Sequence, residues 1–452
     1  MSSTMVYGLA VAGEAVSRAL VDRGERVVLV DDVLTAKHHA LAKELEASLF
    51  DGTDIEEVDR QLRSVDRVVP APGIPERHRI ISESRMLEIP LMSEIEVAYR
   101  LEQEREGGPR QMVGVTGTDG KTTTALMAAA ILTQAGHRGI AVGNTGTPLI
   151  AALGSSAQAF AVECSSFSLA NTHQFRTKAS VWLNFAADHL DWHSGLESYR
   201  NAKAKIWQYT RAGDVAVAPA DDESILQIAR DADARLVTFG ADRGDYNGLD
   251  GQLTSPHGVI MSAHDMNRSL PHDVTNALAA AAICIEAGLA EPRHVAQALA
   301  AFVHAPHRIQ LVAERDGVRW IDDSKATSPH AVQVALKSFT SIVLISGGKN
   351  KNLDLSSMAS QPHRMRGVVA IGHAAPEIAA VFENVCDVET ATSMLEAIRI
   401  ARRLSKSGDV VLLSPGCTSF DWYSSYGERG DDFSRLVVEE LGKESKHVDS
   451  SK

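Results

Sequence analysis

The chain has 452 residues, more than one hydrophobic core usually organises, so its length favours about three domains. A formal net charge of −13 at pH 7, without a block of lysine and arginine, argues against a nucleic-acid or anionic-membrane partner. Four widely spaced cysteines argue against a disulfide framework, and no apolar run approaches the roughly 18 residues of a membrane span, so we expect a cytoplasmic protein.

The first predicted element is a nucleotide-binding βαβ unit. The stretch MVYGLAVAGEAVSRALVDRGERVVLVDD (5–32) predicts a strand, a glycine turn, an amphipathic helix and a strand that ends in two aspartates. The fingerprint G-x-G-x-x-G is incomplete, because Ala10 stands between Gly8 and Gly13 where the middle glycine belongs. A glycine needed only for packing therefore explains the turn nearly as well as a ligand loop does.

The stretch GVTGTDGKTTTALM (114–127) predicts a phosphate-binding loop between a strand and a helix. Loop N–H groups and the helix dipole favour an anion there, and Lys121 adds a mobile positive charge. Thr122 is placed like the P-loop hydroxyl residue that ligates Mg²⁺. The strict pattern G-x-x-x-x-G-K-[ST] fails, because Val115 stands five residues before Gly120. The structural alternative is a glycine turn with an exposed lysine.

Two later strand-like runs end close to possible metal ligands. Glu163 closes the run AFAVE, and His189 follows the run VWLNF. In open α/β sheets such strand ends face the ligand crevice, so the two side chains would hold a metal beside the phosphates. Taken singly, each residue is more often structural. The spacing of His189 and His193 lacks the H-E-x-x-H pattern of a zinc helix.

The domain boundaries follow from composition and from a third set of strands. The charged stretch RLEQEREGGPRQ (100–111) is typical of a linker, and the strands SIVLISGG, GVVAIG and DVVLLSPG alternate with helical patterns near the end of the chain. Strands alternating with helices throughout predict an α/β fold with parallel sheets. We place the domains at 1–104, 105–304 and 305–452.

Seven motifs, in order along the whole chain, resemble the Mur ligases, ATP-dependent amide-forming enzymes that share a fold with folylpolyglutamate synthetase. The motifs are TGTDGKTTT, ECSSF, NFAADHLDWHSGLESYRNAKAKI, HRIQLV, WIDDSKATSP, LISGGKNKNLDL and LLSPGCTSFDWYSSYGERGDDF. The last four are most similar to the D-glutamate-adding branch. The resemblance implies a Rossmann-like N-terminal domain that binds a UDP-sugar, a central P-loop ATPase-like domain, and a Rossmann-like C-terminal domain that binds the amino acid.

The implied reaction adds D-glutamate to UDP-N-acetylmuramoyl-L-alanine through an acyl phosphate, a step of peptidoglycan precursor synthesis on which cell shape and division depend. The implied cofactors are ATP and two Mg²⁺ ions, and we expect a monomer without a nucleic-acid or membrane partner. Other Mur ligases or a folylpolyglutamate synthetase-like ligase with another amino acid remain alternatives. An NAD-dependent oxidoreductase and a non-catalytic P-loop protein are the rivals from other classes.

The resemblance also assigns site residues by position. The catalytic residues it implies are Lys121, His189 and Lys203. The ATP-binding residues are Gly117, Thr118, Asp119, Gly120, Lys121, Thr122, Thr123, Asn276, Arg308 and Asp323. The metal-binding residues are Thr122, Glu163, His189 and Lys203, the last as a carbamate. The UDP-sugar-binding residues are Gly8, Ala10, Val11, Asp31, Pro72, Gly73, Asn144, Ser165 and His189. The glutamate-binding residues are Lys325, Thr327, Lys351, Ser419, Phe420 and Tyr426.

Four positions depart from the family's pattern. Asp119 replaces the usual asparagine of the loop and adds a negative charge beside the phosphates, and Ala10 replaces a glycine. Asp273 replaces an asparagine of the adenine-side motif, and Ser168 stands where glutamine is common. These departures bear on nucleotide contacts more than on the class of reaction.

Overall fold

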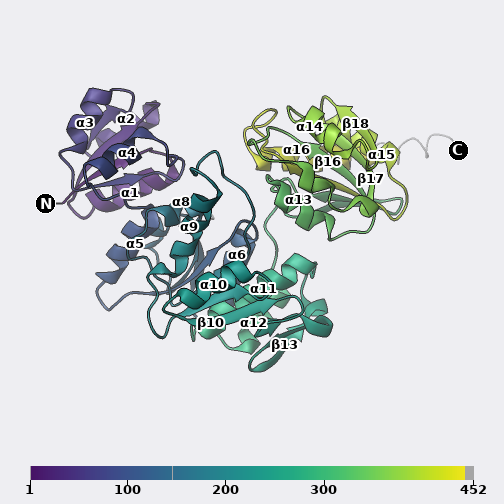
Figure 1. The fold of residues 1–452 in the computed structure, drawn as a ribbon, viewed down its shortest axis with the longest axis horizontal. Helices are drawn as coiled ribbons and strands as arrows, with labels where there is room; N and C mark the ends of the chain where they lie inside the picture. The colour runs from purple at the N-terminus through teal and green to yellow at the C-terminus, as the bar shows by residue number, and fades with distance from the viewer. Residues whose placement is uncertain (1, 145, 443–452) are drawn as a thin grey trace. The chain divides into compact units, whose positions relative to one another are not determined.

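The structure, a computed structural model, describes residues 2–144 and 146–442 (Figure 1). Contacts between residues divide the chain into two compact units. The first unit consists of Met1–Phe185 and Asp191–Phe302, and the second of Ala186–Leu190 and Val303–Lys452. Three sheets are present in the described residues, two in the first unit and one in the second.

The first sheet has four parallel strands in the order β3-β2-β1-β4. Its strands are β1 (Ser3–Tyr7), β2 (Arg26–Asp31), β3 (Ser48–Asp51) and β4 (Arg67–Pro70), and the accompanying helices are α1 (Val11–Val21), α2 (Ala36–Glu44), α3 (Ile55–Leu62) and α4 (Arg79–Met86). Every residue of β1 is buried, as expected for a parallel strand that is covered on both faces. The predicted βαβ unit is confirmed as β1, α1 and β2.

The second sheet has nine strands in the order β13-β12-β11-β10-β9-β8-β5-β7-β6. Its strands are β5 (Gln111–Thr116), β6 (Gly139–Gly143), β7 (Ala159–Glu163), β8 (Ala179–Trp182), β9 (Val215–Pro219), β10 (Arg235–Gly240), β11 (Tyr246–Asn247), β12 (Gln252–Ser255) and β13 (Gly258–Ser262). The pairs of β12 with β11 and β13 are antiparallel, whereas the other pairs are parallel. The nearby helices are α5 (Glu94–Gln103), α6 (Lys121–Gln134), α7 (Leu149–Ala152), α8 (Ser166–Ala170), α9 (Leu196–Gln208), α10 (Glu223–Asp231), α11 (Pro271–Glu286), α12 (Pro292–Ala301), and the 3₁₀ turns η1 (Leu249–Gly251) and η2 (Ala263–Asp265).

The position of β5 decides where the candidate site forms. This strand pairs with β7 on one side and β8 on the other, and all three run parallel. Val115 lies opposite Glu163, and Thr116 lies opposite Trp182. The loops that follow these strands therefore leave the same edge of the sheet. This is the edge at which open α/β sheets bind ligands.

The third sheet, in the second unit, has the order β14-β15-β19-β16-β17-β18, and only its edge strand β14 is antiparallel. Its strands are β14 (Gln310–Arg315), β15 (Val318–Asp322), β16 (Ile342–Gly347), β17 (Met365–Ile371), β18 (Asp387–Ala391) and β19 (Val410–Gly416). Its helices are α13 (Pro329–Leu336), α14 (Ala375–Phe382), α15 (Met394–Leu404), α16 (Tyr426–Gly442), η3 (Ser356–Ala359) and η4 (Pro362–Arg364). The expected α/β fold with parallel sheets is confirmed.

The first two sheets share one apolar core. A single cluster of buried side chains includes Val6 and Leu29 of the first sheet together with Phe160 and Trp182 of the second. This shared core explains why the two sheets belong to one unit. The domain boundaries at 104/105 and 304/305 fall between sheets and stay predictions.

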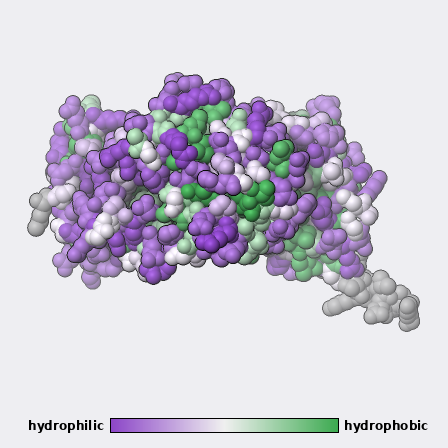
Figure 2. Space-filling model, turned by 90° about the horizontal axis from the view of Figure 1, so that it is seen from below, coloured by the Kyte–Doolittle hydropathy of each residue, from purple (hydrophilic) through white to green (hydrophobic). Residues whose placement is uncertain are grey.

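Hydrophilic residues cover most of the face shown in Figure 2, with apolar residues in separate patches, as is usual for a folded protein. None of the described helices is long and apolar enough to cross a membrane.

Candidate active site

The predicted phosphate loop connects β5 to the first turn of α6. Gly120 is the residue before the helix and has a φ of +83°, a left-handed conformation that glycine adopts without strain. A Cβ atom on Gly120 would lie 2.5 Å from Oδ1 of Asn276, so this predicted ATP residue on α11 lies against the loop. No side chain caps the start of α6. Its N–H groups therefore suit an anion.

The side chain of Asn184, which sequence analysis missed, holds the loop by hydrogen bonds. Its Oδ1 accepts hydrogen bonds from the backbone N–H groups of Thr118 (3.0 Å) and Asp119 (2.9 Å), and its Nδ2 donates to the Asp119 carbonyl (3.1 Å). The Nζ of Lys121 donates to the Thr118 carbonyl at 2.7 Å. The only signal in the sequence was the place of Asn184 just after a strand.

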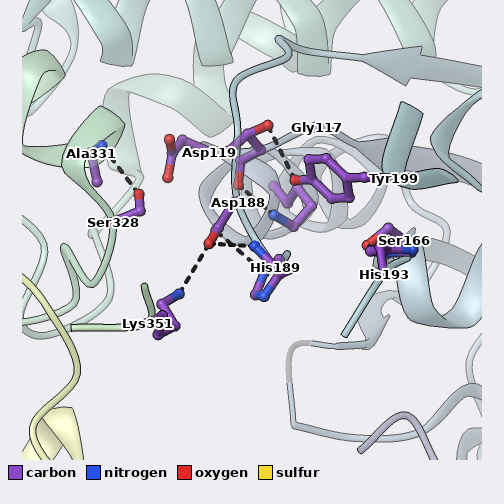
Figure 3. Close-up of polar contacts among 12 residues, drawn as sticks. Gly117, Asp119, Ser166, Asp188, His189, His193, Tyr199, Ser328, Ala331 and Lys351 are labelled. Atoms are coloured by element: carbon purple, nitrogen blue, oxygen red, sulfur yellow. Dashed lines mark hydrogen bonds and ion pairs between the residues drawn. The ribbon is translucent and has the colours of Figure 1, made fainter. Parts of the chain in front are cut away.

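Lys203, on α9, also contacts this loop. Its side chain is 1% exposed, its Nζ donates to the Gly117 carbonyl at 2.6 Å, and it lies 4.6 Å from the centre of the Tyr199 ring. The Tyr199 hydroxyl is 3.2 Å from Oγ1 of Thr118 (Figure 3). Two side chains of one helix therefore contact two successive residues of the phosphate loop.

Glu163 ends β7 and fits the role of a metal ligand. It is 1% exposed, and its Oε1 accepts a hydrogen bond from Nδ2 of Asn144 at 3.1 Å. Its Oε2 is buried and has no hydrogen-bond partner among the described residues. Leaving such an oxygen unsatisfied costs about 1–3 kcal/mol, which a bound cation would offset. Carboxylate and hydroxyl oxygens suit Mg²⁺, and Thr122 supplies a half-buried hydroxyl beside the buried Thr123 on α6.

No group of three histidine, cysteine or acidic residues suited to a metal occurs in the described part of the chain. A site that takes most of its oxygen ligands from a triphosphate needs no such group, because Mg²⁺ is commonly bound by one or two protein oxygens together with phosphates.

The first predicted UDP-sugar segment is the turn around Gly8 and Asp31. The Asp31 carboxylate accepts hydrogen bonds from the backbone N–H groups of Leu9 (2.7 Å) and Val33 (3.0 Å), so it orders the turn from within. A Cβ atom on Gly13 would lie 1.9 Å from the Gly8 carbonyl oxygen, which explains why α1 needs glycine at this point. The exposed residues of the turn are Ala10 and Val11.

Three further predicted UDP-sugar residues lie in the first unit. The Pro72 carbonyl accepts a hydrogen bond from Nε1 of Trp192 at 2.8 Å, and open space surrounds the position where Gly73 would carry a Cβ atom. Ser165 precedes α8, where its Oγ accepts from the Ser168 N–H at 3.0 Å and lies 2.6 Å from the Ser168 hydroxyl. The serine that departs from the family's glutamine thus pairs with a predicted ligand-binding residue.

The second unit contains the remaining predicted ATP residues, Arg308 and Asp323. The buried Asp323 accepts hydrogen bonds from the Ser414 hydroxyl at 2.8 Å and from the Ile309 N–H at 3.3 Å. Burial raises the pKa of Asp323 to about 7, although the Arg308 charge acts in the opposite direction. The carboxyl group therefore exchanges its proton near neutral pH.

His189 and Lys351 meet at Asp188, which sequence analysis missed. The Lys351 Nζ lies 3.1 Å from Oδ1 of Asp188, and the same carboxylate accepts the His189 N–H at 2.8 Å and lies 3.3 Å from its ring (Figure 3). All three belong to the second unit. The cation predicted to bind glutamate is therefore paired with an aspartate in this structure.

The other predicted glutamate residues lie on two loops of the second unit and at the first residue of α16, Tyr426. Lys325 places its Nζ 3.7 Å from the centre of the Tyr426 ring, and Thr327 is half-buried in the same loop. Ser419 is buried at the start of the second loop, whereas Phe420 is 68% exposed. An aromatic wall that is open to solvent on this scale is suited to contact a ligand.

Arg429 joins these two loops, although sequence analysis did not single it out. It is 1% exposed and donates hydrogen bonds to the carbonyl groups of Ser324 (2.9 Å) and Cys417 (3.2 Å). Its presence in the motif YGERGDDF carried no sign of burial.

Comparison with known proteins agrees with this arrangement. Residues 115–284 match the family described as the Mur ligase middle domain, and residues 307–417 match the Mur ligase glutamate ligase domain. The UDP-N-acetylmuramoylalanine–D-glutamate ligase of Frankia casuarinae is 38% identical over 96% of this chain and 93% of its own length. The chain belongs to the Mur ligase family. The enzyme of the same name from Rubrobacter xylanophilus is 37% identical over 97% of this chain and 98% of its own.

Solved Mur ligases share the fold. MurF from Thermotoga maritima, in complex with ADP, has a TM-score of 0.62 at 19% identity and covers 93% of this chain and 96% of its own. MurC from the same organism has a TM-score of 0.59 at 18% identity, with coverage of 98% and 100%. The expected three-domain Mur ligase architecture is confirmed at the level of the fold.

The position of Lys121 yields a test of the phosphate loop. Lys121→Ala should lower kcat roughly 10²-fold or more without unfolding the protein, because it removes a preorganised charge from the phosphates. Steady-state kinetics and urea unfolding would measure both quantities. Lys43→Ala, at an exposed position of α2, is the control and should leave kcat unchanged. Near-normal turnover by folded Lys121→Ala would refute the assignment.

Proposed function

We propose that the protein is an ATP-dependent ligase that adds D-glutamate to UDP-N-acetylmuramoyl-L-alanine in peptidoglycan precursor synthesis. The observation that carries this proposal is the phosphate loop with the unsatisfied carboxylate of Glu163 at the next strand end. It occurs in a chain that is similar to UDP-N-acetylmuramoylalanine–D-glutamate ligases over nearly their whole length.

The chemistry begins with a carboxylate that must be activated. An amine does not displace oxide from a carboxylate, so the carboxylate oxygen first attacks the γ-phosphorus of ATP, and ADP leaves. The glutamate amine then attacks the acyl carbon, phosphate leaves with the carboxylate oxygen, and the amine loses its proton. No covalent bond to the enzyme is needed.

The chain's own groups position and neutralise the reactants. Lys121 and the N–H groups at the start of α6 face the phosphates, and Asn184 holds the loop in shape before ATP arrives. Bound Mg²⁺, held by Thr122 and Glu163 with His189 serving a second ion, would reduce the repulsion between the carboxylate and the triphosphate.

The glutamate residues are assigned to the second unit. Lys351 supplies a positive charge, the hydroxyl groups of Thr327 and Ser419 supply donors, and Phe420 and Tyr426 supply walls. Because Asp188 already pairs with Lys351, we propose that the substrate carboxylate shares or replaces this partner.

The rival functions leave parts of the site without a use. An NAD-dependent oxidoreductase would use the first βαβ unit. It would have no use for the phosphate loop, for Lys121, or for Lys203, which contacts the loop from α9. A non-catalytic nucleotide-binding protein would not need the second unit's glutamate set. Another Mur ligase or a folylpolyglutamate synthetase-like ligase would use the same mechanism with a different amino acid, so the amino acid must be tested directly.

We further propose that the enzyme is a cytoplasmic monomer with domains at 1–104, 105–304 and 305–452. Its free cysteines, three of them buried, are consistent with a reducing compartment. ATP and a nucleotide-linked sugar are also substrates of that compartment.

We propose that Lys203 acts as a carbamate. Its buried Nζ donates to the Gly117 carbonyl, and a carbamate keeps one N–H for this bond while adding two anionic oxygens able to help hold a metal. Lys203→Ala should be inactive and should regain part of its activity with added short carboxylic acids, as measured by phosphate release.

Lys205→Ala is the control for this experiment, because Lys205 lies on the same helix but donates to the Ala170 carbonyl, away from the loop. It should not respond to added acids. A fully active Lys203→Ala enzyme would end the carbamate proposal.

The choice of amino acid tests the function itself. Phosphate release with UDP-N-acetylmuramoyl-L-alanine should require D-glutamate and should not occur with L-glutamate, alanine or diaminopimelate, because a pocket that holds both carboxylates fixes where the amine points. Lys351→Ala should raise KM for D-glutamate by about 10- to 100-fold, the range for a lost charge-assisted hydrogen bond, and leave KM for ATP unchanged.

Lys349→Ala, at an exposed position two residues away, is the matched control and should behave like the unaltered enzyme. Incorporation of L-glutamate or a diamino acid instead of D-glutamate would reject the substrate assignment while leaving the amide-ligase mechanism in place.

A further inference from the structure

Glu76 lies in the turn of residues 72–76, here called the UDP-sugar turn, and links it to the start of α9. It follows Pro72 and Gly73 in the same turn, and its carboxylate accepts hydrogen bonds from the Ser194 N–H at 3.0 Å and from the Ser198 hydroxyl at 2.7 Å. A carboxylate at this end of a helix also interacts favourably with the helix dipole. The turn thus places a carboxylate at the N-terminus of α9, a helix that has no side-chain cap of its own.

The backbone on both sides of this contact is joined as well. The Glu76 N–H donates to the Trp192 carbonyl at 3.2 Å, and Nε1 of Trp192 donates to the Pro72 carbonyl at 2.8 Å. Two backbone carbonyls and one carboxylate therefore fix residues 72–76 against residues 192–198. The contact is specified by several atoms and does not depend on one flexible ion pair.

His193 fills the space behind Glu76. Its Nδ1 lies 3.5 Å from the Glu76 carboxylate. Its Nε2 is 2.9 Å from the Ser166 hydroxyl (Figure 3). Burial lowers the pKa of His193, although the neighbouring Glu76 carboxylate acts in the opposite direction. Burial alone would raise the pKa of Glu76, but the hydrogen bonds from Ser198 and Ser194 outweigh it and lower that pKa. The contacts of Glu76 therefore favour its ionised form.

The choice of partner by Glu76 is selective. A cavity of about 600 Å³ beside it is also lined by Arg85 and Lys205, yet Glu76 forms no ion pair with either cation in the described structure. The carboxylate instead accepts hydrogen bonds from residues at the beginning of α9.

The other end of this connection is the phosphate loop. The helix whose first turn contacts Glu76 also carries Tyr199 and Lys203, which contact Thr118 and Gly117 of the loop. The ring of Tyr199 also lies 5.2 Å from that of His193, measured between centres. A short path of direct contacts therefore runs from the UDP-sugar turn through α9 to the loop that faces ATP.

We infer that Glu76 is a positioning residue that holds the UDP-sugar turn in register with α9 and the phosphate loop, so that the substrate carboxylate meets the γ-phosphate. The inference rests on the proposed function. Glu76 is assigned no contact with any of the three substrates, since its carboxylate accepts hydrogen bonds from Ser194 and Ser198. Displacement of reactants by about 1 Å can cost roughly 10²-fold in rate, so such a residue has a measurable effect.

The test compares Glu76→Ala, Glu76→Gln and the control Glu197→Gln, an exposed residue of the first turn of α9. Glu76→Ala should raise KM for UDP-N-acetylmuramoyl-L-alanine at least about tenfold and lower kcat, with KM for ATP unchanged because Asn184 and Lys203 still hold the loop. Glu76→Gln retains an acceptor for Ser194 and Ser198 and should recover most of the loss. The control should stay within about twofold of the unaltered enzyme.

Trp192→Phe removes the hydrogen bond to Pro72 and should raise KM for the UDP-sugar by a smaller factor. If Glu76→Ala does not fold, the KM values of Trp192→Phe and Glu76→Gln test the inference. An unchanged KM for the UDP-sugar in the folded variants would overturn the inference alone. Equal rises in KM for all three substrates would also overturn it, because they would indicate general loss of structure. An unaltered enzyme without ligase activity would overturn the proposed function and this inference with it.

Discussion

The site depends on the parallel pairing of β5 with β7 and β8. This pairing brings three chain segments to one edge of the sheet: the phosphate loop after β5, Glu163 at the end of β7, and Asn184 just beyond β8. Hydrogen bonds with Asn184 then fix the loop, and one buried oxygen of Glu163 has no hydrogen-bond partner among the described residues. Sheet register, which hydrophobic burial sets, therefore brings the parts of the proposed ATP site together.

Charge is the second constraint. A chain with a net charge of −13 is proposed to bind a triphosphate, a diphosphate sugar and glutamate, all anions. The positive charges assigned to these ligands are accordingly local. They are Lys121 and Lys203 at the phosphate loop, and Lys325 and Lys351 in the second unit. Each of these ammonium groups contacts a carbonyl, a carboxylate or an aromatic ring in the structure, which restrains it before a ligand binds.

Sequence patterns revealed what is local and missed what is tertiary. The βαβ unit, the phosphate loop and the strand end at Glu163 follow from runs of residues that can be read directly. Asn184, Asp188 and Glu76 gave no such signal, because each acts on residues distant along the chain. Asp31 shows the same limit: the sequence places it at a strand end, but only the fold shows its carboxylate bound to backbone N–H groups.

The central claim is that a substrate carboxylate is activated by the γ-phosphoryl group of ATP. The most direct measurement uses UDP-N-acetylmuramoyl-L-alanine labelled with ¹⁸O in its carboxylate and determines by mass spectrometry where the label goes during ligation to D-glutamate. The account predicts that each phosphate released carries one ¹⁸O atom from the substrate. Phosphate that acquires its new oxygen from water, or label that stays wholly in the amide product, would contradict the acyl-phosphate mechanism.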